Sequence, residues 1–578
     1  MRDATRGDEH QRRSPFYKII VLTLTAILVG ALSSLAAIGF VELVGWLNNV
    51  LLVSPRSRVQ FEAHTWLVPV ATVIIPATGG LMVGVLIHKL APANRALGPP
   101  GVIQAVQLRS GLPDTRSGWI TICASAVSLG FGASVGQYGP MVYLGAMFGN
   151  IMAKLRLGIS HLRSIAVACG VAAAISTAFN APIAGLVFAH EVVLRHYSTQ
   201  AFAPTTVAAS VGYIIANVVF DRPPLFLVSF SGVQYGYEFF LFGLLGLFCA
   251  VVAIFFMRLL LFTAEMAAKN KIPAIMRPAA AGLCLGLVGL WLPDILGMGK
   301  ETLRFATIAG AFTLAELPLL IIAKIFLTAL CIGFGFAGGV FSPSLLIGVL
   351  TGALFWMLAD SVFGLPNSGV VVYALCGMMA LASPVIGAPL TAILIVFELT
   401  RNYDITIASM VGVVFSNLIA HHVFGRSLFD VQLLRSGVDL STGRDQAQLQ
   451  AAKVLDYQAE NLVTAHFWDA SEAVIQRIAD SGWTTAFVLD EDGSLIGIFT
   501  KQIRPGTVGS QMTQPTAVFD ETTGILDALH GLGSFVGDAV PIVERNSNRF
   551  LGAVTEAAVV AAYIEISQSL RQEENAAL

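Results

Sequence analysis

Two glycine-rich stretches that each end in proline are the residues of this chain best suited to chemistry. Residues 130–140 (GFGASVGQYGP) and 333–343 (GFGFAGGVFSP) repeat glycine, phenylalanine and proline at a constant offset of 203. Glycine lets an ion approach the backbone closely, and proline in the first turn of a helix needs no N–H partner. Because a helix N-terminus carries about half a positive charge, the two stretches predict an uncharged anion site lined by backbone N–H groups.

A site of this kind suits the interior of a membrane. A bare lysine or arginine at mid-membrane is costly and would hold its counter-ion too tightly for flux, and broken backbone is tolerated only where it lines protein or a cavity. Glycine-rich helix packing with proline kinks is the structural alternative for either stretch alone. The repetition favours a transport site between two halves of a membrane protein.

The composition agrees with that interpretation. Hydrophobic residues make up 55% of the 578 residues, charged residues only 12%, and the mean hydropathy is +0.74. Soluble domains carry roughly 25% charged residues, and a bilayer-spanning helix needs about 20 apolar residues. The sequence therefore predicts an all-α polytopic membrane protein built from two inverted repeats of broken and tilted helices. The apolar runs within 202–263 can be divided into spans in more than one way.

The chain also excludes several classes of function. A net charge of −2 without a long basic run argues against a nucleic-acid partner. The six cysteines form no CxxC pair, and we interpret them as packing residues. The sequence offers no evident nucleophile–base pair or metal-ligand cluster, so we expect neither an enzyme nor a metalloprotein. Lysine and arginine before the first apolar run favour a cytoplasmic N-terminus.

The composition changes near residue 440, and the chain is polar from about residue 450. Residues 485–490 and 497–500 form a strand–turn–strand pattern that 538–543 and 552–555 repeat, which predicts a soluble α/β module. The expected organisation is a tail at 1–16, a membrane domain at 17–440 with halves at about 17–220 and 235–440, the module at 450–566, and a tail at 567–578.

Over residues 17–440 the sequence resembles the CLC family of chloride channels and proton-coupled anion antiporters. The family motifs GREGP and GGIFAP are matched by residues 136–140 and 338–343, FNAPLAG by 179–185, and GSGIP, less well, by 99–103. Residues 450–566 resemble a pair of CBS repeats. The resemblance implies a multi-pass homodimer in the plasma (inner) membrane, with one pore per subunit and the CBS pair on the cytoplasmic side.

The resemblance also implies which residues line the anion pathway and where this chain departs from the family. The pathway positions are Pro100, Gly101, Val102, Gly136, Gln137, Tyr138, Gly139, Gly339, Val340, Phe341 and Phe429. Tyr138 occupies the position of the gating, proton-carrying glutamate, and Val192 that of the inner proton-transfer glutamate. A phenol is neutral at pH 7 and cannot replace a carboxylate there. Passive conduction is favoured over antiport.

Two further departures concern selectivity. Pro100 stands where the family places a serine hydroxyl, a change associated with nitrate preference, and Phe429 stands where it places the pore tyrosine. A neutral hydrogen bond contributes roughly 0.5–1.5 kcal/mol, so loss of both hydroxyls should weaken central binding and penalise weakly hydrated anions least. Chloride, nitrate and bromide are the expected anions. Lys300 falls in the second-half counterpart of the Pro100 region, where a solvated charge or positive potential near the pore mouth is expected.

Several alternatives stay open. An antiporter with another proton path, through Tyr138, water or histidines such as His190, or a non-conducting sensor, would fit the same residues. Glu191 and Glu398, related by an offset of 207, suit a functional carboxylate, helix capping or dimer packing equally well. In nucleotide-binding CBS modules an Asp follows the strand-ending Thr by three residues. Here those positions are Ile503 and Ala558, so an adenine nucleotide is doubtful and no cofactor is expected.

Overall fold

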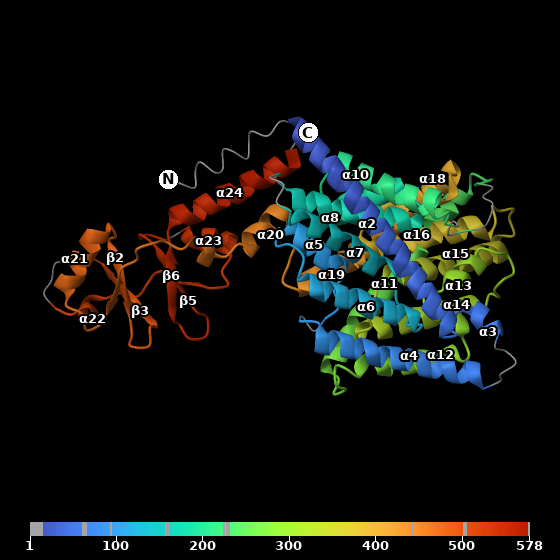
Figure 1. Cartoon of the computed structure of the whole chain (residues 1–578), viewed down its shortest axis with the longest axis horizontal. Coiled ribbons are helices and arrows are strands. Elements are labelled where there is room, and N and C mark those ends of the chain that lie inside the picture. Colours follow the sequence, from blue (N-terminus) through green and yellow to red (C-terminus); the bar gives the residue numbers. More distant parts are fainter. Residues whose placement is uncertain are drawn as a thin grey trace. The chain divides into compact units, whose positions relative to one another are not determined.

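A computed structural model describes residues 15–575 apart from 61–65, 93–94, 156–158, 160, 223–225, 227–231, 442, 501–505 and 534 (Figure 1). Two compact units divide the chain, the first ending at Ser436 and the second running from Gly437 to Asn575. Ile503 and positions 1–14 of the N-terminal tail lie outside the described residues.

The first unit is entirely helical in its described part. Its first half contains α2 (Pro15–Val50), α3 (Pro55–Gln60), α4 (Leu67–Val85), η1 (Leu86–Leu90), α5 (Pro99–Gln107), α6 (Thr115–Gly130), α7 (Tyr138–Ala153), α8 (Leu162–Phe179), α9 (Pro182–Phe188), η2 (Ala189–Leu194), α10 (Thr199–Tyr213) and η3 (Ile214–Val219). Its second half contains α11 (Glu238–Lys269), α12 (Arg277–Gly289), η4 (Pro293–Ile295), α13 (Lys300–Phe305), α14 (Glu316–Gly333), α15 (Phe341–Phe363), α16 (Val370–Ile386), α17 (Pro389–Thr400), α18 (Tyr403–Phe424) and α19 (Leu428–Arg435).

The apolar segments explain these helices. Eight helices of the described part are long and apolar enough to cross a membrane, and four shorter apolar helices accompany them. In a bilayer the backbone must satisfy its hydrogen bonds within the segment, which a helix does. The ambiguous run at 202–263 resolves into α10 with η3, a break, and the long helix α11. The predicted fold class of a mostly helical, polytopic membrane protein is confirmed.

The two halves repeat their packing as well as their sequence. Helix α8 packs against α2, α7 and α10, and α16 packs in the same way against α11, α15 and α18. Glycines set the closest approach in both copies: a Cβ on Gly145 of α7 would lie 2.2 Å from the Gly170 oxygen, and one on Gly348 of α15 would lie 2.6 Å from the Gly377 oxygen. Figure 1 shows α4 and α12, from different halves, side by side.

The second unit consists of two small mixed sheets with helices. Its elements are α20 (Arg444–Ala451), η5 (Val454–Tyr457), β1 (Thr464–His466), α21 (Ser471–Ser481), β2 (Thr485–Leu489), β3 (Leu495–Thr500), α22 (Val508–Gln511), β4 (Phe519–Asp520), α23 (Ile525–Leu532), β5 (Val540–Val543), β6 (Phe550–Val554) and α24 (Glu556–Asn575). Strand β1 pairs parallel with β2, which pairs antiparallel with β3, and β4–β5–β6 repeats this order.

The register of the second unit confirms the repeat seen in the sequence. Thr464 pairs with Phe487 in one sheet, and Phe519 pairs with Ile542 in the other. A shared apolar cluster joins the sheets, with the Phe487 and Phe550 rings stacked at 5.0 Å. Each sheet has only three short strands and needs further packing for stability, so this shared core holds the two copies as one module. The arrangement is consistent with a CBS-like α/β domain.

Candidate functional site

The two glycine-rich stretches bind each other directly. The Gly136 N–H donates to the Gly339 oxygen at 2.6 Å, and the Gly339 N–H donates to the Gly136 oxygen at 2.8 Å. A Cβ on Gly136 would lie 2.7 Å from the Gly339 oxygen, so only glycine fits at this crossing. The two halves of the chain therefore meet at the motif that they share.

Side chains reinforce this crossing. The Ser342 hydroxyl accepts a hydrogen bond from the Gln137 N–H at 3.1 Å, and the Ser134 and Thr328 hydroxyls lie 2.8 Å apart. The Ser128 hydroxyl accepts from the Ala337 N–H at 3.1 Å. All three contacts join one half to the other, which fixes the loops without placing a charge beside them.

Helix N-termini converge on the crossing. Helices α7 and α15 begin at Tyr138 and Phe341, directly after the paired glycines. Helix α5 begins at Pro99, whose Cδ lies 3.6 Å from the Cβ position of Gly139, and α19 packs against α5. The first N–H groups of a helix have no partner within it and favour negative charge. The sequence-predicted residues on α5, α7 and α15 are thus brought together, with Phe429 on the neighbouring α19.

Tyr138 is enclosed by aromatic rings. Its ring stacks on Phe179 with centroids 4.2 Å apart, and it lies against Phe341 at 5.2 Å. Phe179 and Phe341 themselves lie 5.3 Å apart. Only 4% of Tyr138 is exposed. Each such ring pair contributes about 0.5–1.5 kcal/mol beyond burial, so the ring is held in this position.

A cavity of about 440 Å³ ends at Tyr138. Its described lining includes Gln137, Tyr138 and Phe179, but no residue from the N-termini of α5 or α19. The aromatic cluster therefore closes the inner end of the cavity. Its wall carries the basic residues Arg222, Lys300 and Arg304 and the acidic residue Glu42.

The charges around this cavity are predominantly positive. Arg222 forms an ion pair with Glu42, which leaves the wall with a net positive charge. Of the two alternatives for Lys300, the structure favours positive potential near the pathway, because this residue is half-buried and shares the cavity wall with Tyr138. Arg304 follows Lys300 by four residues on α13 and so lies on the same helix face, whereas no sequence pattern indicated that Arg222, from a distant segment, would join them.

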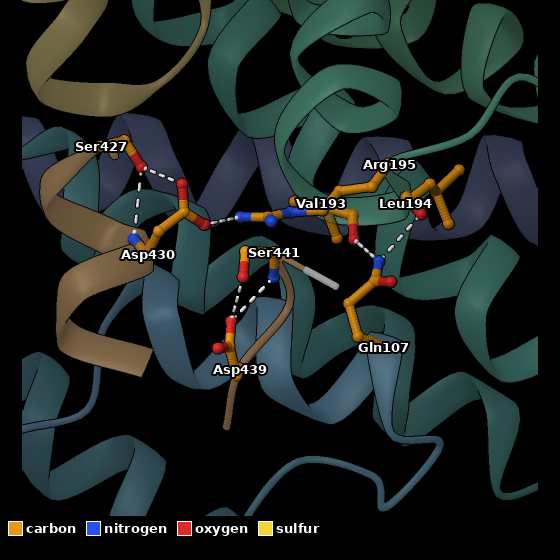
Figure 2. Close-up of polar contacts among 8 residues, drawn as sticks. All are labelled: Gln107, Val193, Leu194, Arg195, Ser427, Asp430, Asp439 and Ser441. Carbon is orange, nitrogen blue, oxygen red and sulfur yellow. Dashed lines mark hydrogen bonds and ion pairs between the residues drawn. The ribbon is translucent and has the colours of Figure 1, made fainter. Parts of the chain in front are cut away.

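A second cavity, of about 350 Å³, has Val192 in its wall. Val192 is 3% exposed and lies on η2, and the cavity is also lined by His190, Glu191, Arg195 and Asp430. Figure 2 shows Arg195 reaching Asp430 of α19, at 2.5 Å, while the same carboxylate accepts from Ser427 at 2.7 Å. The side-chain amide of Gln107 on α5 donates to the oxygens of Val193 and Leu194. These contacts fix η2 to α5 and α19, the two helices that carry the predicted pathway residues Pro100, Gly101, Val102 and Phe429.

The histidine nearest Val192 is held in structural hydrogen bonds. His190 is fully buried, with Nδ1 3.0 Å from the His196 oxygen and Nε2 3.1 Å from the Thr205 hydroxyl. Its ring stacks on Tyr197 with centroids 5.3 Å apart. Both ring nitrogens are therefore engaged, one by the turn after η2 and the other by α10.

Glu191 and Glu398 cap helices of the opposite half. The Glu191 carboxylate accepts from the N–H groups of Leu390 and Thr391, at 2.9 and 2.8 Å, at the start of α17. The Glu398 carboxylate accepts from Ile183 and Ala184, at 2.9 and 2.7 Å, at the start of α9. Of the alternatives left open by the sequence, the geometry favours capping.

Sequence reasoning missed a buried lysine. Lys324 on α14 is 1% exposed, and its Nζ donates to the oxygens of Ile295 and Gly297 at 2.8 Å each. Gly297 in turn donates its N–H to the oxygen of Gly132, in the first glycine-rich stretch. The available signal was a lone lysine in an apolar segment, since intramembrane charges are by default functional candidates.

In the second unit, the residue three positions after the Thr that ends each repeat shows whether a ribose could be held as in nucleotide-binding CBS modules. The Thr555 hydroxyl accepts from the Ala558 N–H at 3.1 Å and so caps α24. Ala558 offers no carboxylate for a ribose, and the equivalent Ile503 lies outside the described residues. Among the described residues, no group of three or more His, Cys, Asp or Glu side chains could hold a metal ion.

Comparisons with known proteins agree with this geometry. The family model "Voltage gated chloride channel" matches residues 79–421. A protein of Ralstonia nicotianae named as a ClcB-like chloride channel protein is 28% identical over 71% of this chain and 96% of its own length. The H(+)/Cl(-) exchange transporter ClcA of Citrobacter koseri is 28% identical over 72% and 89%. Chloride channel protein CLC-f of Arabidopsis thaliana is 31% identical over 67% and 52%.

Solved structures share the fold. A slow cyanobacterial Cl-/H+ antiporter aligns with a TM-score of 0.64 at 23% identity, over 72% of this chain and 97% of its own. A eukaryotic CLC transporter aligns with a TM-score of 0.62 at 19% identity, over 94% of this chain and 98% of its own. The family model covers more than half of the sequence, including both glycine-rich stretches that cross at Gly136 and Gly339. The chain belongs to the voltage-gated chloride channel family, the CLC family.

Proposed function

We propose that this protein conducts chloride and similar monovalent anions passively, without moving protons. The observation that carries the proposal is Tyr138, a neutral phenol buried between Phe179 and Phe341 at the position of the family's gating glutamate. A group that stays neutral at pH 7 cannot mimic a bound anion or deliver a proton with each cycle.

The inner side of the pathway supports the same proposal. Val192 replaces the inner proton-transfer glutamate of the antiporters, and it lines a cavity together with the Arg195–Asp430 ion pair. His190 lies two residues before Val192, and its two nitrogens are already engaged by His196 and Thr205. Neither family carboxylate is present to relay a proton.

The same site bears on which anions pass. Pro100 and Phe429 supply no hydroxyl, so coordination rests on backbone groups near Gly101, Val102, Val340 and Phe341, shaped by the crossing of Gly136, Gly139 and Gly339. Losing two neutral donors removes roughly 1–3 kcal/mol of coordination. Weakly hydrated anions lose least, which supports nitrate and bromide beside chloride.

The proposal includes the assembly and its setting. We expect a homodimer in the plasma (inner) membrane, with the N-terminus and the CBS-like unit on the cytoplasmic side. Ala558 supports a CBS-like unit that acts without an adenine nucleotide, so no cofactor is required for conduction.

Anion efflux from proteoliposomes tests the proposal. Purified protein is reconstituted with internal chloride, nitrate or bromide, a voltage is imposed with a potassium ionophore, and the external pH is recorded throughout. We expect efflux that follows the voltage, with nitrate at least as fast as chloride and no proton movement.

Two results would contradict passive conduction. Uphill proton uptake driven by an anion gradient would establish exchange through another path, and loss of that uptake in His190→Gln would identify its carrier. If neither the wild type nor Tyr138→Ala conducts any anion, the result would favour a non-conducting sensor.

A further inference from the structure

The first turn of α19 carries a carboxylate beside the predicted pathway. Asp430 is the third residue of this eight-residue helix and directly follows Phe429, one of the predicted pathway positions. A helix N-terminus favours a negative group, and a carboxylate in the first turn supplies that group from the chain itself. Asp430 therefore competes with any anion that approaches the N-terminus of α19, so the partners of this carboxylate bear on anion access.

Two contacts hold the Asp430 carboxylate. One oxygen accepts from the Arg195 guanidinium at 2.5 Å, and the other accepts from the Ser427 hydroxyl at 2.7 Å (Figure 2). The side chains of Arg195 and Asp430 are 27% and 26% exposed, so the pair is only partly shielded from solvent. An ion pair with this exposure adds little to stability. Its main consequence is therefore the position and the neutralisation of the carboxylate.

The turn that carries Arg195 is tied to the other helix that bears pathway residues. The side-chain amide of Gln107, at the end of α5, donates to the oxygens of Val193 and Leu194 at 2.7 and 2.8 Å, directly before Arg195. Arg195 itself has a φ of 57°, a left-handed conformation that is uncommon for a residue with a Cβ. Such a conformation persists where the surrounding structure determines it. Helix α5 and η2 together place the guanidinium that reaches α19.

The cavity at Val192 shows how the pair affects local charge. Its described lining contains two carboxylates, those of Glu191 and Asp430, and Arg195 as its one lysine or arginine side chain. Glu191 accepts from the first N–H groups of α17, and both ring nitrogens of His190 are engaged. Without Arg195, the charge of Asp430 would be uncompensated and would repel an anion in this cavity.

We propose that Arg195 is a positioning residue for anion conduction, because it holds and neutralises the Asp430 carboxylate and so lets anions reach the N-terminus of α19. This role rests on the proposed function, in which Phe429 lines the pathway. Asp430 is then an anionic group of the chain itself that competes with the conducted anion once Arg195 is lost, in a protein where Tyr138 stands at the position of the gating glutamate.

Calorimetric titration of chloride into the purified full-length protein tests this role without depending on flux. Arg195→Gln removes the charge and keeps a Cβ, so the left-handed backbone is strained no more than in the wild type. We expect this variant to bind chloride about tenfold more weakly, because it leaves a charge of the same sign as the ligand uncompensated. Asp430→Asn should bind chloride at least as tightly as the wild type, and Arg195→Gln combined with Asp430→Asn should regain the wild-type affinity.

Two further variants separate charge from structure. Arg195→Lys keeps a cation that can make the single N–H···O contact with Asp430, and it should retain most of the wild-type affinity. Arg435→Gln is the matched control, since Arg435 lies at the other end of α19, pairs with Glu265 at 2.6 Å and does not line the cavity at Val192. It should leave chloride affinity unchanged. Unfolding temperatures measured in parallel show that each variant is folded.

Efflux from proteoliposomes should follow the same order, slowed in Arg195→Gln and restored in the double variant. Affinity lost equally in Arg195→Gln and in the double variant would assign Arg195 a purely structural role and overturn the proposal. Wild-type affinity in Arg195→Gln, or weaker binding in Asp430→Asn, would also overturn it. A wild type that binds chloride but passes none would contradict passive conduction instead, and the order of affinities would still decide the role of Arg195.

Discussion

Among single residues, Tyr138 lies at the end of the positively charged cavity, where the proposed function gives it the role of closing the pathway. Its two ring contacts, at about 0.5–1.5 kcal/mol each, favour the closed position by roughly 5-fold or more in population. We expect Tyr138→Ala to raise the efflux rate several-fold. Tyr138→Glu should instead make efflux pH-dependent, because it introduces a carboxylate that can close the pathway and bind a proton. Rates of chloride efflux between pH 5 and 8 measure both effects.

Tyr138→Phe is the matched control, since it keeps the three rings and removes only the hydroxyl. A rate equal to that of the wild type would assign the effect to the ring. A Tyr138→Ala variant that conducts no faster than the wild type would contradict a closing role for this side chain.

Lys324 is a fully buried basic residue of α14 that is linked to the first glycine-rich stretch through Gly297. Its Nζ donates to the carbonyl oxygens of Ile295 and Gly297. We expect Lys324→Gln, which keeps N–H donors and removes the charge, to weaken chloride binding several-fold with little loss of stability. Calorimetric titration of chloride measures the affinity.

Lys324→Met separates the two roles of this side chain. It leaves two buried carbonyl oxygens without a donor, at about 1–3 kcal/mol each, although it also removes the cost of burying a charge. We expect weaker chloride binding in both variants and a lower unfolding temperature in Lys324→Met alone. Chloride affinity unchanged in Lys324→Gln would show that the charge does not act on the pathway.

Much of the site at this scale could be predicted from the sequence, for a physical reason. The crossing at Gly136 and Gly339 can be read from the sequence, because only glycine lets the two backbones come this close. The complete positive wall of the cavity at Tyr138 leaves no such signal. Lys300 and Arg304 share one face of α13, but only tertiary folding brings Arg222, from a distant segment, to the same wall.

At the scale of helices, reciprocal capping by Glu191 and Glu398 joins the two halves. Each carboxylate satisfies two of the N–H groups that the first turn of a helix leaves without a partner, and loss of a cap costs about 0.5–2 kcal/mol. We expect Glu191→Ala and Glu398→Ala each to lower the unfolding temperature in detergent while the selectivity among anions stays unchanged. Wild-type stability combined with lost efflux would instead assign these carboxylates to the pathway.

In the second unit, Asp520 holds the turn that connects β4 to α23. Its carboxylate accepts from the Thr522 hydroxyl at 2.6 Å, the Thr522 N–H at 2.9 Å and the Thr523 hydroxyl at 3.0 Å. The hydrogen bond from the Thr522 hydroxyl is the main cause that lowers the pKa of Asp520. Since its pKa is lower when folded than when unfolded, this group stabilises the fold above the ordinary carboxyl pKa of about 3.9, and the stabilisation is lost as pH falls through the folded value.

Asp520→Asn should therefore unfold at a lower temperature than the wild type at pH 7, and the difference should shrink as pH falls below about 4. Thermal unfolding of the full chain at several pH values measures it. Asp492→Asn, at an exposed turn residue, is the control and should match the wild type at each pH. A difference that stays constant down to pH 3 would mean that the asparagine acts through packing rather than through charge.

The helices and strands themselves follow from apolar runs and turn residues, and most could be predicted. The spans at 202–263 could not be divided from sequence alone, because apolar and aromatic residues occur on both sides of its polar and glycine-containing stretches. Packing resolves it: α10 contacts α8 and α2, whereas α11 contacts α14, α16 and α18. Which polar residues cap which helix is also a tertiary property, as the pairing of Glu191 with α17 illustrates.

For the molecule as a whole, the net charge and the local charge at the cavity have opposite signs. The net charge is −2, yet the cavity that leads to Tyr138 carries Arg222, Lys300 and Arg304 against Glu42. A cleft lined by one sign of charge raises the local concentration of the opposite ion, and salt screens this effect over a Debye length of about 8–10 Å. The whole-chain charge therefore says little about how an anion meets the pathway.

Lys300→Gln should slow anion entry because it removes one of these cations without altering Tyr138 or the glycine crossing. We expect efflux roughly 2- to 5-fold slower at low ionic strength, approaching the wild-type rate in about 1 M salt, where the Debye length falls to about 3 Å. Arg116→Gln, which removes a charge outside this cavity, should conduct like the wild type in both conditions. If Lys300→Gln slows efflux equally at low and high salt, Lys300 acts by binding the anion at short range. If the variant conducts at the wild-type rate at low salt, the cavity is not the entrance to the pathway.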